Sequence, residues 1–571
     1  MEEALECPMI RVLSTNIVSP LGFTSEENYQ SIRSGKTGLC QYENPWGIPE
    51  TITASLFSEE QNRKLKTDGL SRFESLVFTS VKDAMSKVPF DMLSNNTVFI
   101  LSSTKGNIEA LSEGNELTNL ALSAKKISGK LGFSNEPIVV CNACISGAAA
   151  QLLAWRLIHS GRYDYAVVCG ADCQSKFIVS GFSSLKALSP EPCRPFDMER
   201  YGLNLGEAAA TIILGKERPD ECRDSWYMHA GAIRNDAVHI SNPSKTAEGA
   251  IRAIRKALPP NPLVSLISLH GTATLYNDQM EAVALKRTSL DSVPAMALKG
   301  YFGHTMGAAG ILETIISIYA TEDHQALPTK GFSELGVSAN IGVSNRPQPI
   351  SGNSILKMIA GFGGCNAALF FSKDKMEKAS SAQVPQTKST HHVRITPHEV
   401  LIDGNLYDTK ETGMSLLTEL YKKEVNDYPK YYKMDGLSKL AFVASELLLK
   451  AEGNKKDHSE NRSVILFNHS SSISSDLAFE VTIDSNDYFP SPSVFVYTLP
   501  NIATGEIAIR NTYYGETSFY ILSHKMQEKM DEIVNSSFWD EEMQSSLCGW
   551  IDFQNDSNFE ADLYIKERIL N

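Results

Sequence analysis

The stretch VVCNACISGAAA, residues 139–150, joins an apolar run to a series of small residues and carries two cysteines three positions apart. An apolar run that passes into small residues of helical length is typical of a strand-to-helix junction. Cys141 and Cys144 are open to three interpretations: half of a metal site, a redox pair, or a nucleophile at the start of a helix, where the dipole lowers the thiol pKa. The surrounding sequence has to distinguish among them.

Similar runs lie on both sides of this junction. Four segments have the composition of buried strands: TVFILSS (97–103), PIVVCNA (137–143), YAVVCGAD (165–172) and AATIILG (209–215). Between the second and the third, SGAAAQLLAWRLIHSG (146–161) has helical length and small residues. This alternation predicts a layered α/β fold with a substantially parallel sheet.

Composition places the chain among ordinary globular proteins. Of its 571 residues, 42% are hydrophobic and 21% are charged. No apolar run approaches the roughly 18 residues of a membrane span, and the acidic start argues against a signal peptide. Ten scattered cysteines in a chain of this size favour a reduced, cytoplasmic protein. The net charge of −14 disfavours nucleic acid as a partner but leaves room for local basic patches.

A polar segment divides the chain in two. Residues 374–392, DKMEKASSAQVPQTKSTHH, are predicted to link a piece of residues 1–373 to a piece of residues 393–571. The two pieces share a repeat, because DGLSRFESLVFTSVKDA begins at Asp68 and DGLSKLAFVASELLLKA begins at Asp435. An apolar run follows each copy at nearly the same offset. The second piece is therefore interpreted as a partial copy of the start of the first.

Three further segments combine an apolar run with a chemically active side chain or a glycine-rich turn: SLISLHGTATLYNDQMEA (265–282), ALKGYFGHTMGAAGILETI (297–315) and IAGFGGCNAAL (359–369). They contribute His270, Lys299, His304 and Phe362. Each segment alone is compatible with ordinary packing, just as a lone free cysteine is most often simply buried. A metal site at Cys141 and Cys144 would need a second ligand pair at matching spacing.

The combination of ACISG, HGTAT, LKGYFGHTMGAAG and GFGGCNAAL resembles the β-ketoacyl-acyl carrier protein synthases of the thiolase-like superfamily. The resemblance covers nearly all of residues 9–373. It implies a layered αβαβα fold of two related halves, about 1–215 and 216–373, with an additional thiolase-like half at the C-terminus. It also implies a decarboxylative condensation of an acyl group with a malonyl group, both carried on the phosphopantetheine of an acyl carrier protein.

The resemblance assigns roles to the residues at matching positions. Cys144 corresponds to the acylated nucleophile, and His270 and His304 correspond to the histidines that hold the malonyl carbonyl. Lys299 matches a lysine that orders the site, and Phe362 matches a gating aromatic whose N–H joins that of Cys144 in an oxyanion hole. The residues implied to bind substrate are Thr272, Thr274, Gly361 and Gly363, and those implied to support the histidine loops are Asp278, Glu281 and Glu313. Cys141 is expected only to pack, and neither a metal nor a bound cofactor is expected.

Two departures from the family pattern remain open. Cys365 stands where the synthases usually have threonine, which keeps a degradative thiolase as an alternative, although that enzyme needs one histidine and a second cysteine as base. The segment between Ser103 and Cys144 is shorter than in elongating synthases, where part of it lines the partner's acyl pocket. The accepted acyl length is therefore left open.

The C-terminal piece resembles the first half of the same fold. FPSPSVFVYTLPNIATGEIAIRNTYYGETSFYILSHKM (489–526) resembles the segment that the first piece lacks, but the nucleophile position falls near His524 and holds no cysteine. The piece resembles a truncated, inactive chain-length factor; a decayed duplication kept for stability is the alternative. We expect it to pair with the catalytic piece as an intrachain pseudo-dimer or in a homodimer, or to engage a separate ketosynthase-like subunit.

A cluster of basic residues precedes the first copy of the repeat. NRKLKTDGLSR (62–72) brings Arg63, Lys64 and Lys66 together, and these residues are predicted to dock the acidic carrier protein. The predicted function is ketosynthase elongation in specialised fatty acid, aryl polyene or other polyketide synthesis. A non-catalytic scaffold or chain-length subunit is the alternative from another class.

Overall fold

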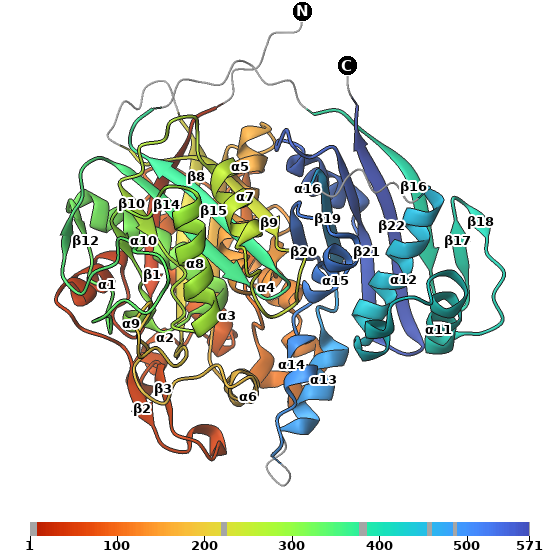
Figure 1. Ribbon diagram of the computed structural model, residues 1–571, viewed down its shortest axis with the longest axis horizontal. Helices are drawn as coiled ribbons and strands as arrows, with labels where there is room; N and C mark the ends of the chain where they lie inside the picture. Colours follow the sequence, from red (N-terminus) through yellow and green to blue (C-terminus); the bar gives the residue numbers. More distant parts are fainter. Residues whose placement is uncertain (1–7, 218–224, 376–384, 454–459, 484–487, 570–571) are drawn as a thin grey trace, which may run out of the picture.

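The computed structural model describes residues 8–217, 225–375, 385–453, 460–483 and 488–569 (Figure 1). Its first sheet has the order β1 (Ile10–Val18), β8 (Ala208–Lys216), β6 (Tyr165–Asp172), β4 (Thr97–Ser102) and β5 (Ile138–Val140). β4 runs parallel to both β5 and β6, and every residue of β4 and β6 is buried. Continuous apolar strands of this kind belong to a sheet covered on both faces. The four predicted strands and their partly parallel arrangement are confirmed.

A second sheet and three helical layers complete the first piece. The order of this sheet is β11 (Ala295–Met296), β10 (Leu266–Ser268), β14 (Ser354–Gly361), β15 (Cys365–Ser372) and β9 (Tyr227–Asn235). Two buried helices, α5 (Ser146–His159) and α10 (Ala309–Glu322), lie between the sheets and pack on both. Helix α3 (Arg72–Ser86) covers the outer face of the first sheet, and α7 (Glu248–Ala257) covers that of the second. These are the layers of the predicted αβαβα fold, which is confirmed.

The C-terminal piece repeats the first sheet. Its order is β20 (Thr517–Ile521), β19 (Arg462–Asn468), β21 (Ser545–Asn555), β22 (Asn558–Arg568) and β16 (Thr387–Ile395). These strands follow one another in space as β5, β4, β6, β8 and β1 do. Helix α12 (Gly436–Ala451), which carries the second copy of the repeat, packs on this sheet as α3 packs on the first. The predicted partial duplication is therefore visible as a repeated strand order.

The two pieces are joined edge to edge through their sheets. β20 pairs with β5 in antiparallel register, with Tyr520 opposite Val140 and Ile521 opposite Val139. Beside this joint a guanidinium nitrogen of Arg156 lies 2.7 Å from a carboxylate oxygen of Glu516, and both side chains are buried. Breaking a buried ion pair of this kind is strongly destabilising. The sequence leaves open whether the C-terminal piece pairs within its own chain or with another subunit. The structure contains the pairing within the chain.

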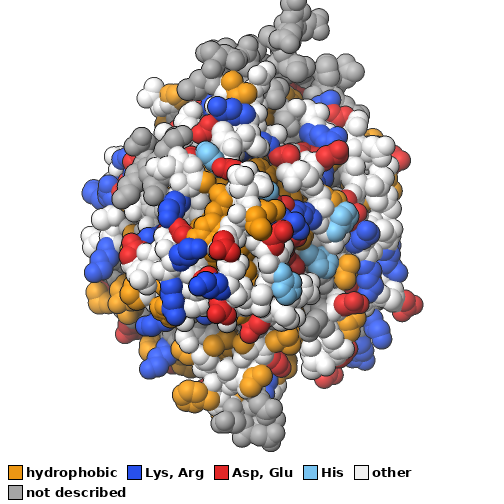
Figure 2. All heavy atoms as spheres, turned by 90° about the vertical axis from the view of Figure 1, so that its right-hand side faces the viewer, with side chains coloured by type: hydrophobic (Ala, Val, Ile, Leu, Met, Phe, Trp, Pro, Cys, Tyr) orange, Lys and Arg blue, Asp and Glu red, His pale blue; other side chains and the backbone are white. Residues whose placement is uncertain are grey.

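The far edge of the long sheet is formed by short strands. β16 is followed by β17 (Val400–Ile402) and by the two-residue β18 (Asn405–Leu406). Figure 2 shows acidic and basic side chains interspersed over this end of the molecule. Short edge strands with charged neighbours resist further strand pairing. None of the helices in the described residues combines the length and low polarity that a membrane crossing requires.

The predicted linker is partly wrong. Residues 376–384 of the predicted segment lie outside the described residues, but β16 begins at Thr387, six residues before the predicted start of the C-terminal piece at residue 393. Most residues at the start of β16 are exposed or partly exposed, so their polar composition is compatible with a strand. β16 pairs with β22, and this pairing outweighs the local composition. The division predicted near residue 215 falls at the end of β8, whose last residue is Lys216.

Candidate active site

Cys144 lies where β5 turns into α5. It sits in the single 3-10 turn Ala143–Ile145, and Ala143 has a positive φ of 49°, which bends the chain sharply before the helix begins at Ser146. Burial raises the pKa of the Cys144 thiol to about 12, and nearby Lys299 lowers it only in part. The net shift is therefore opposite to the one expected from the helix start, because burial disfavours the thiolate.

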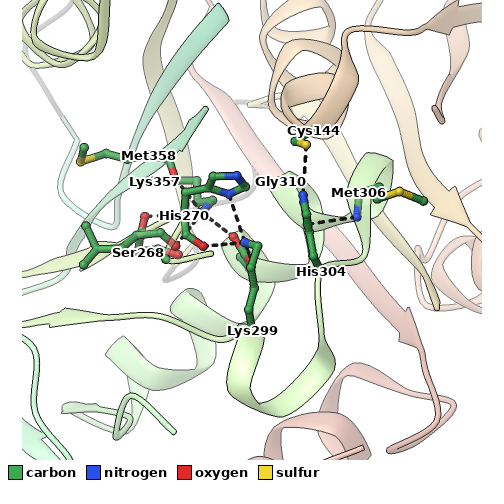
Figure 3. Close-up of polar contacts among 12 residues, drawn as sticks. Cys144, Ser268, His270, Lys299, His304, Met306, Gly310, Lys357 and Met358 are labelled. Atoms are coloured by element: carbon green, nitrogen blue, oxygen red, sulfur yellow. Dashed lines mark hydrogen bonds and ion pairs between the residues drawn. The ribbon is translucent and has the colours of Figure 1, made fainter. Parts of the chain in front are cut away.

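His304 faces this cysteine. Its Nε2 lies 3.0 Å from Cys144 Sγ, and its Nδ1 accepts a hydrogen bond of 3.3 Å from the backbone N–H of Met306 (Figure 3). Burial and the charge of Lys299 hold the pKa of His304 well below its usual range, so the ring is neutral. A neutral imidazole that accepts at Nδ1 carries its proton on Nε2. His304 therefore presents an N–H donor toward the nucleophile.

His270 is held in the same state by a different partner. Lys299 Nζ lies 3.1 Å from His270 Nδ1 and donates to the His270 carbonyl at 2.6 Å. Burial, followed by the charge of Lys299, holds the pKa of His270 well below its usual range. An ammonium can only donate, so His270 accepts at Nδ1 and carries its proton on Nε2. The two rings meet edge to face with centroids 5.2 Å apart.

A buried carboxylate bridges two lysines beneath the histidines. Glu313 on α10 lies 2.7 Å from Lys299 Nζ and 2.6 Å from Lys357 Nζ, and all three side chains are almost fully buried. Lys357 lies on β14 and was missed by the sequence analysis, although a lysine inside the apolar run ILKMIA is a signal that could have identified it. The bridge fixes Lys299 and explains why Glu313 occupies this position.

Two further acids hold the loop that carries His270. Glu281 accepts from the backbone N–H of His270 and of Gly271, each at 2.7 Å. Burial raises its pKa to about 7. Asp278 accepts from Ala273 N–H at 3.1 Å and from Phe196 N–H at 2.7 Å, and burial raises its pKa to about 6. Both residues thus contact the loops that the resemblance expected them to support.

The glycine-rich turn between β14 and β15 forms the opposite wall. Residues 361 and 365 pair directly, and Gly363 and Gly364 have φ of 91° and 73°, which favour glycine. Cys365 Sγ donates to the Phe362 carbonyl at 3.2 Å, so Cys365 keeps a hydrogen-bonding role as well as packing. Gly363, predicted to bind substrate, does not line the cavity; it packs against the C-terminal piece instead.

The site opens into a cavity of about 350 Å³. Its lining includes seven of the predicted residues: Cys144, His270, Thr272, Thr274, His304, Gly361 and Phe362. The Thr272 and Thr274 hydroxyls lie 2.8 Å apart. Tyr201, Leu275 and Tyr276 also line the cavity and are more than half exposed, which the sequence analysis did not foresee. An apolar entrance leading to a few convergent polar groups is typical of a ligand site.

The C-terminal piece contributes a wall beside the turn. Phe495 on α14 (Pro492–Val496) packs edge-on against Phe182, whose ring stacks on Phe362. Gly181 on α6 (Lys176–Ser184) makes room for this contact, because a Cβ there would come within 2.0 Å of the Phe495 ring. In the first piece, the segment between β4 and α4 (Leu120–Leu131) contains only two short 3-10 helices. The C-terminal piece therefore packs behind the Phe182–Phe362 pair, whereas the residues that line the cavity come from the first piece. That it supplies the missing wall of the acyl pocket stays a prediction.

The predicted carrier-docking residues lie on the surface and away from the cavity lining. Arg63 and Lys64 are on α2 (Glu59–Leu65), and Lys66 directly follows it. Lys64 pairs with Glu60 one turn earlier. Arg72, seven residues after the end of this helix, is engaged by the buried Glu207 and by Glu109. Docking at this cluster stays a prediction.

Cys144, His270 and His304 also lie close enough together to be considered as ligands of a metal ion. Within the described residues, Cys144, His270 and His304 offer one ligand atom each within 4.8 Å of one another. Cys141, considered above as a ligand, and Cys169 and Cys173, which could have formed a second ligand pair, are buried in or beside strands and do not belong to this group. The ammonium of Lys299 beside His270 opposes binding of a cation.

Comparisons with protein families agree with this geometry. Residues 9–219 match the family described as "Beta-ketoacyl synthase, N-terminal domain", and residues 227–333 match "Beta-ketoacyl synthase, C-terminal domain". Together the matches extend over more than half of the chain. The chain belongs to the β-ketoacyl synthase family. The predicted family is thereby confirmed.

Curated relatives of this β-ketoacyl synthase carry the same family name. The "3-oxoacyl-[acyl-carrier-protein] synthase 2" of Rhizobium meliloti is 34% identical over 44% of this chain and 64% of its own length. The protein of the same name from Coxiella burnetii is 26% identical over 65% of this chain and 99% of its own length. Nearly the whole of the second relative thus matches about two thirds of this chain.

Two solved structures show the same fold. "The ishigamide ketosynthase/chain length factor" aligns with a TM-score of 0.58 at 23% identity, over 64% of this chain and all of its own. "PfaC Keto synthase-Chain length factor" aligns with a TM-score of 0.76 at 12% identity, over 98% of this chain and 78% of its own. The second alignment extends the likeness in fold to both pieces of this β-ketoacyl synthase.

Proposed function

We propose that this protein is a 3-oxoacyl-acyl carrier protein synthase whose nucleophile is Cys144. The observation that carries the proposal is the pair of neutral imidazoles, each with its proton on Nε2, beside a cysteine at the floor of an open cavity. A thiol accepts an acyl group as a thioester, and two N–H donors stabilise an enolate oxygen as its charge develops.

In the first half-reaction the Cys144 sulfur attacks the acyl thioester carbonyl. The bond from that carbonyl to the carrier sulfur breaks, and the thiol proton leaves with the released phosphopantetheine thiol. Because burial keeps the pKa of Cys144 high, the thiol is neutral at rest and loses its proton during attack. The N–H groups of Cys144 and Phe362 are the proposed oxyanion donors for this step.

In the second half-reaction malonyl thioester replaces the free carrier. Its carboxylate leaves as carbon dioxide, and the electron pair forms an enolate whose oxygen accepts from Nε2–H of His270 and His304. The enolate carbon attacks the acyl carbonyl, the Cys144 thioester breaks, and the sulfur takes up a proton. The product is a 3-oxoacyl thioester on the carrier protein.

The shape and polarity of the cavity also suit a substrate delivered by an acyl carrier protein. The entrance formed by Tyr201, Leu275 and Tyr276 leads to hydroxyls of Thr272 and Thr274 that suit the amide-rich phosphopantetheine arm. One similar solved structure is "AntDE:AntF (apo): type II PKS acyl-carrier protein in complex with its ketosynthase bound to the hexaketide". No metal or resident cofactor is part of the proposed chemistry.

The C-terminal piece is proposed to act as a fused chain-length factor in specialised fatty acid, polyene or polyketide synthesis. Its junction after β20 has no cysteine, and it places Phe495 beside the Phe182–Phe362 stack. An acyl chain that extends past Phe362 would meet this aromatic cluster. The thiolase alternative is less favoured, because the Cys365 thiol is directed to the Phe362 carbonyl and two histidines, not one, lie beside Cys144.

The test is direct detection of the acyl-enzyme. The full chain is incubated with hexanoyl-acyl carrier protein, and the adduct is located by intact-protein and peptide mass spectrometry. Adding malonyl-carrier protein should discharge the adduct into a 3-oxooctanoyl product. Cys144→Ala should abolish both events, whereas Cys141→Ala should leave both in place. Condensation by the Cys144→Ala variant would overturn the proposal.

A further inference from the structure

Two equivalent helices of the repeated sheets begin after an asparagine. Asn119 precedes α4, which leads to β5, and Asn501 precedes α15 (Ile502–Asn511), which leads to β20. Asn119 caps its helix in the usual way, because its side-chain oxygen accepts from Leu122 N–H at 3.0 Å, and its Nδ2 donates to the His469 carbonyl of the C-terminal piece at 3.0 Å. The Asn501 side chain makes no capping hydrogen bond to its own helix.

Asn501 instead reaches into the catalytic piece. Its Nδ2 donates to the Phe362 carbonyl at 2.8 Å, and its side chain is almost fully buried. The contact depends on glycines, since a Cβ on Gly363 would come within 2.7 Å of Asn501 Nδ2. A Cβ on Gly505, one turn into α15, would likewise come within 2.7 Å of the Gly363 carbonyl. The start of α15 is thus seated directly on the glycine-rich turn.

The other polar groups of this turn are held from within the catalytic piece. The Gly363 carbonyl accepts from Asn235 Nδ2 at 2.8 Å, and the Gly363 N–H donates to the Ile240 carbonyl at 2.6 Å. The Phe362 carbonyl receives the weak Sγ donor of Cys365 and the stronger amide donor of Asn501. The strong restraint on Phe362 therefore comes from the C-terminal piece.

We infer that Asn501 is a positioning residue for acyl transfer at Cys144, supplied by the piece that has no nucleophile. By holding the Phe362 carbonyl, it fixes the backbone on the C-terminal side of Phe362, while the pairing of Gly361 with Cys365 fixes the other side. The Phe362 N–H is then aimed at the oxyanion without rearrangement during the reaction. This inference rests on the proposed function and adds that the C-terminal piece acts on reaction rate as well as on product length.

The experiment measures acylation of Cys144 in the full chain with hexanoyl-pantetheine, in single turnover by intact-protein mass spectrometry. Asn501→Ala removes the donor, and Asn501→Asp keeps the shape but replaces the donor with a carboxylate oxygen. Both should slow acylation by roughly tenfold to a hundredfold, somewhat less than the loss of an oxyanion donor itself. Alkylation of Cys144 by iodoacetamide, which uses no oxyanion, should proceed at the native rate.

Asn119→Ala is the matched control. It removes a helix cap and a hydrogen bond to the C-terminal piece at residues that do not line the cavity, so it should lower the thermal midpoint while leaving the acylation rate within about twofold. Asn501→Ala has no cap to lose. Acylation at the native rate by both Asn501 variants would overturn the inference, as would an equal fall in acylation and alkylation. If the native chain formed no adduct at all, the proposed function would fail, and the inference with it.

Discussion

His304 Nε2 lies 3.0 Å from Cys144 Sγ while the backbone N–H of Met306 occupies Nδ1 of the same ring. Lys299 Nζ occupies Nδ1 of His270 in the same way. Two unrelated partners, a backbone amide and an ammonium, thus bring both imidazoles to one tautomer. Because both Nε2–H donors are assigned to the enolate, variants of the histidines should affect condensation and leave acyl loading intact.

His270→Ala and His304→Ala should still form the acyl-enzyme but lose condensation. Each removes one Nε2–H donor to the enolate, for which a loss of about 10²- to 10³-fold is expected. Single-turnover loading and steady-state condensation are compared for each variant. If both folded variants failed to load, the histidines would belong to the first half-reaction.

Glu313→Gln should destabilise the protein by about 3–5 kcal/mol, because it leaves the buried ammonium groups of Lys299 and Lys357 without their shared counterion. Urea unfolding at pH 7 measures this change. Glu322→Gln, at the partly exposed end of the same helix, should cost no more than about 1 kcal/mol. Equal effects of the two substitutions would contradict the proposed bridge.

Glu281 should make stability fall as pH rises. Burial raises its pKa from 4.5 to about 7, so between these values the native state holds a proton that the unfolded state releases. The resulting contribution is fully present below pH 4.5 and is lost as pH rises through about 7. Asp278 acts in the same direction. Unfolding free energies measured from pH 4.5 to 7.5 should decline less steeply for Glu281→Gln, and an unchanged slope would refute the assignment.

Phe495→Leu should shift the products toward longer acyl chains, since it shortens the side chain that packs on Phe182 beside Phe362. Mass spectrometry of the carrier-bound products after repeated condensation gives the distribution. Phe489→Leu is the control, because Phe489 lies on the same segment but is 79% exposed. Identical products from all three proteins would mean that the aromatic cluster does not limit chain length.

Local patterns predicted the strands around Cys144 and brought its histidine partners to notice, because catalytic side chains at strand ends leave compact motifs. Contacts formed between distant segments were not predictable in this way. Lys357 stands out as a lysine in an apolar run, but its partner Glu313 is identified only in the folded chain. Asn501 has the sequence position of an ordinary helix cap, and its contact with Phe362 is likewise seen only in the fold. Thr387 falls in the predicted linker because its local sequence is polar, and its pairing strand β22 lies far along the chain. The high pKa of Cys144 likewise depends on how deeply the assembled layers bury it.

The antiparallel pairing of β5 with β20 also has a consequence for assembly. Joining two segments of one chain is a unimolecular event, so dilution cannot separate them as it separates the subunits of a dimer. Each catalytic piece therefore meets its own companion piece in a fixed ratio of one to one. Related synthases in the same cell would have difficulty exchanging partners with it, and the Phe495 ring that packs on Phe182 beside Phe362 is always encoded in the same gene.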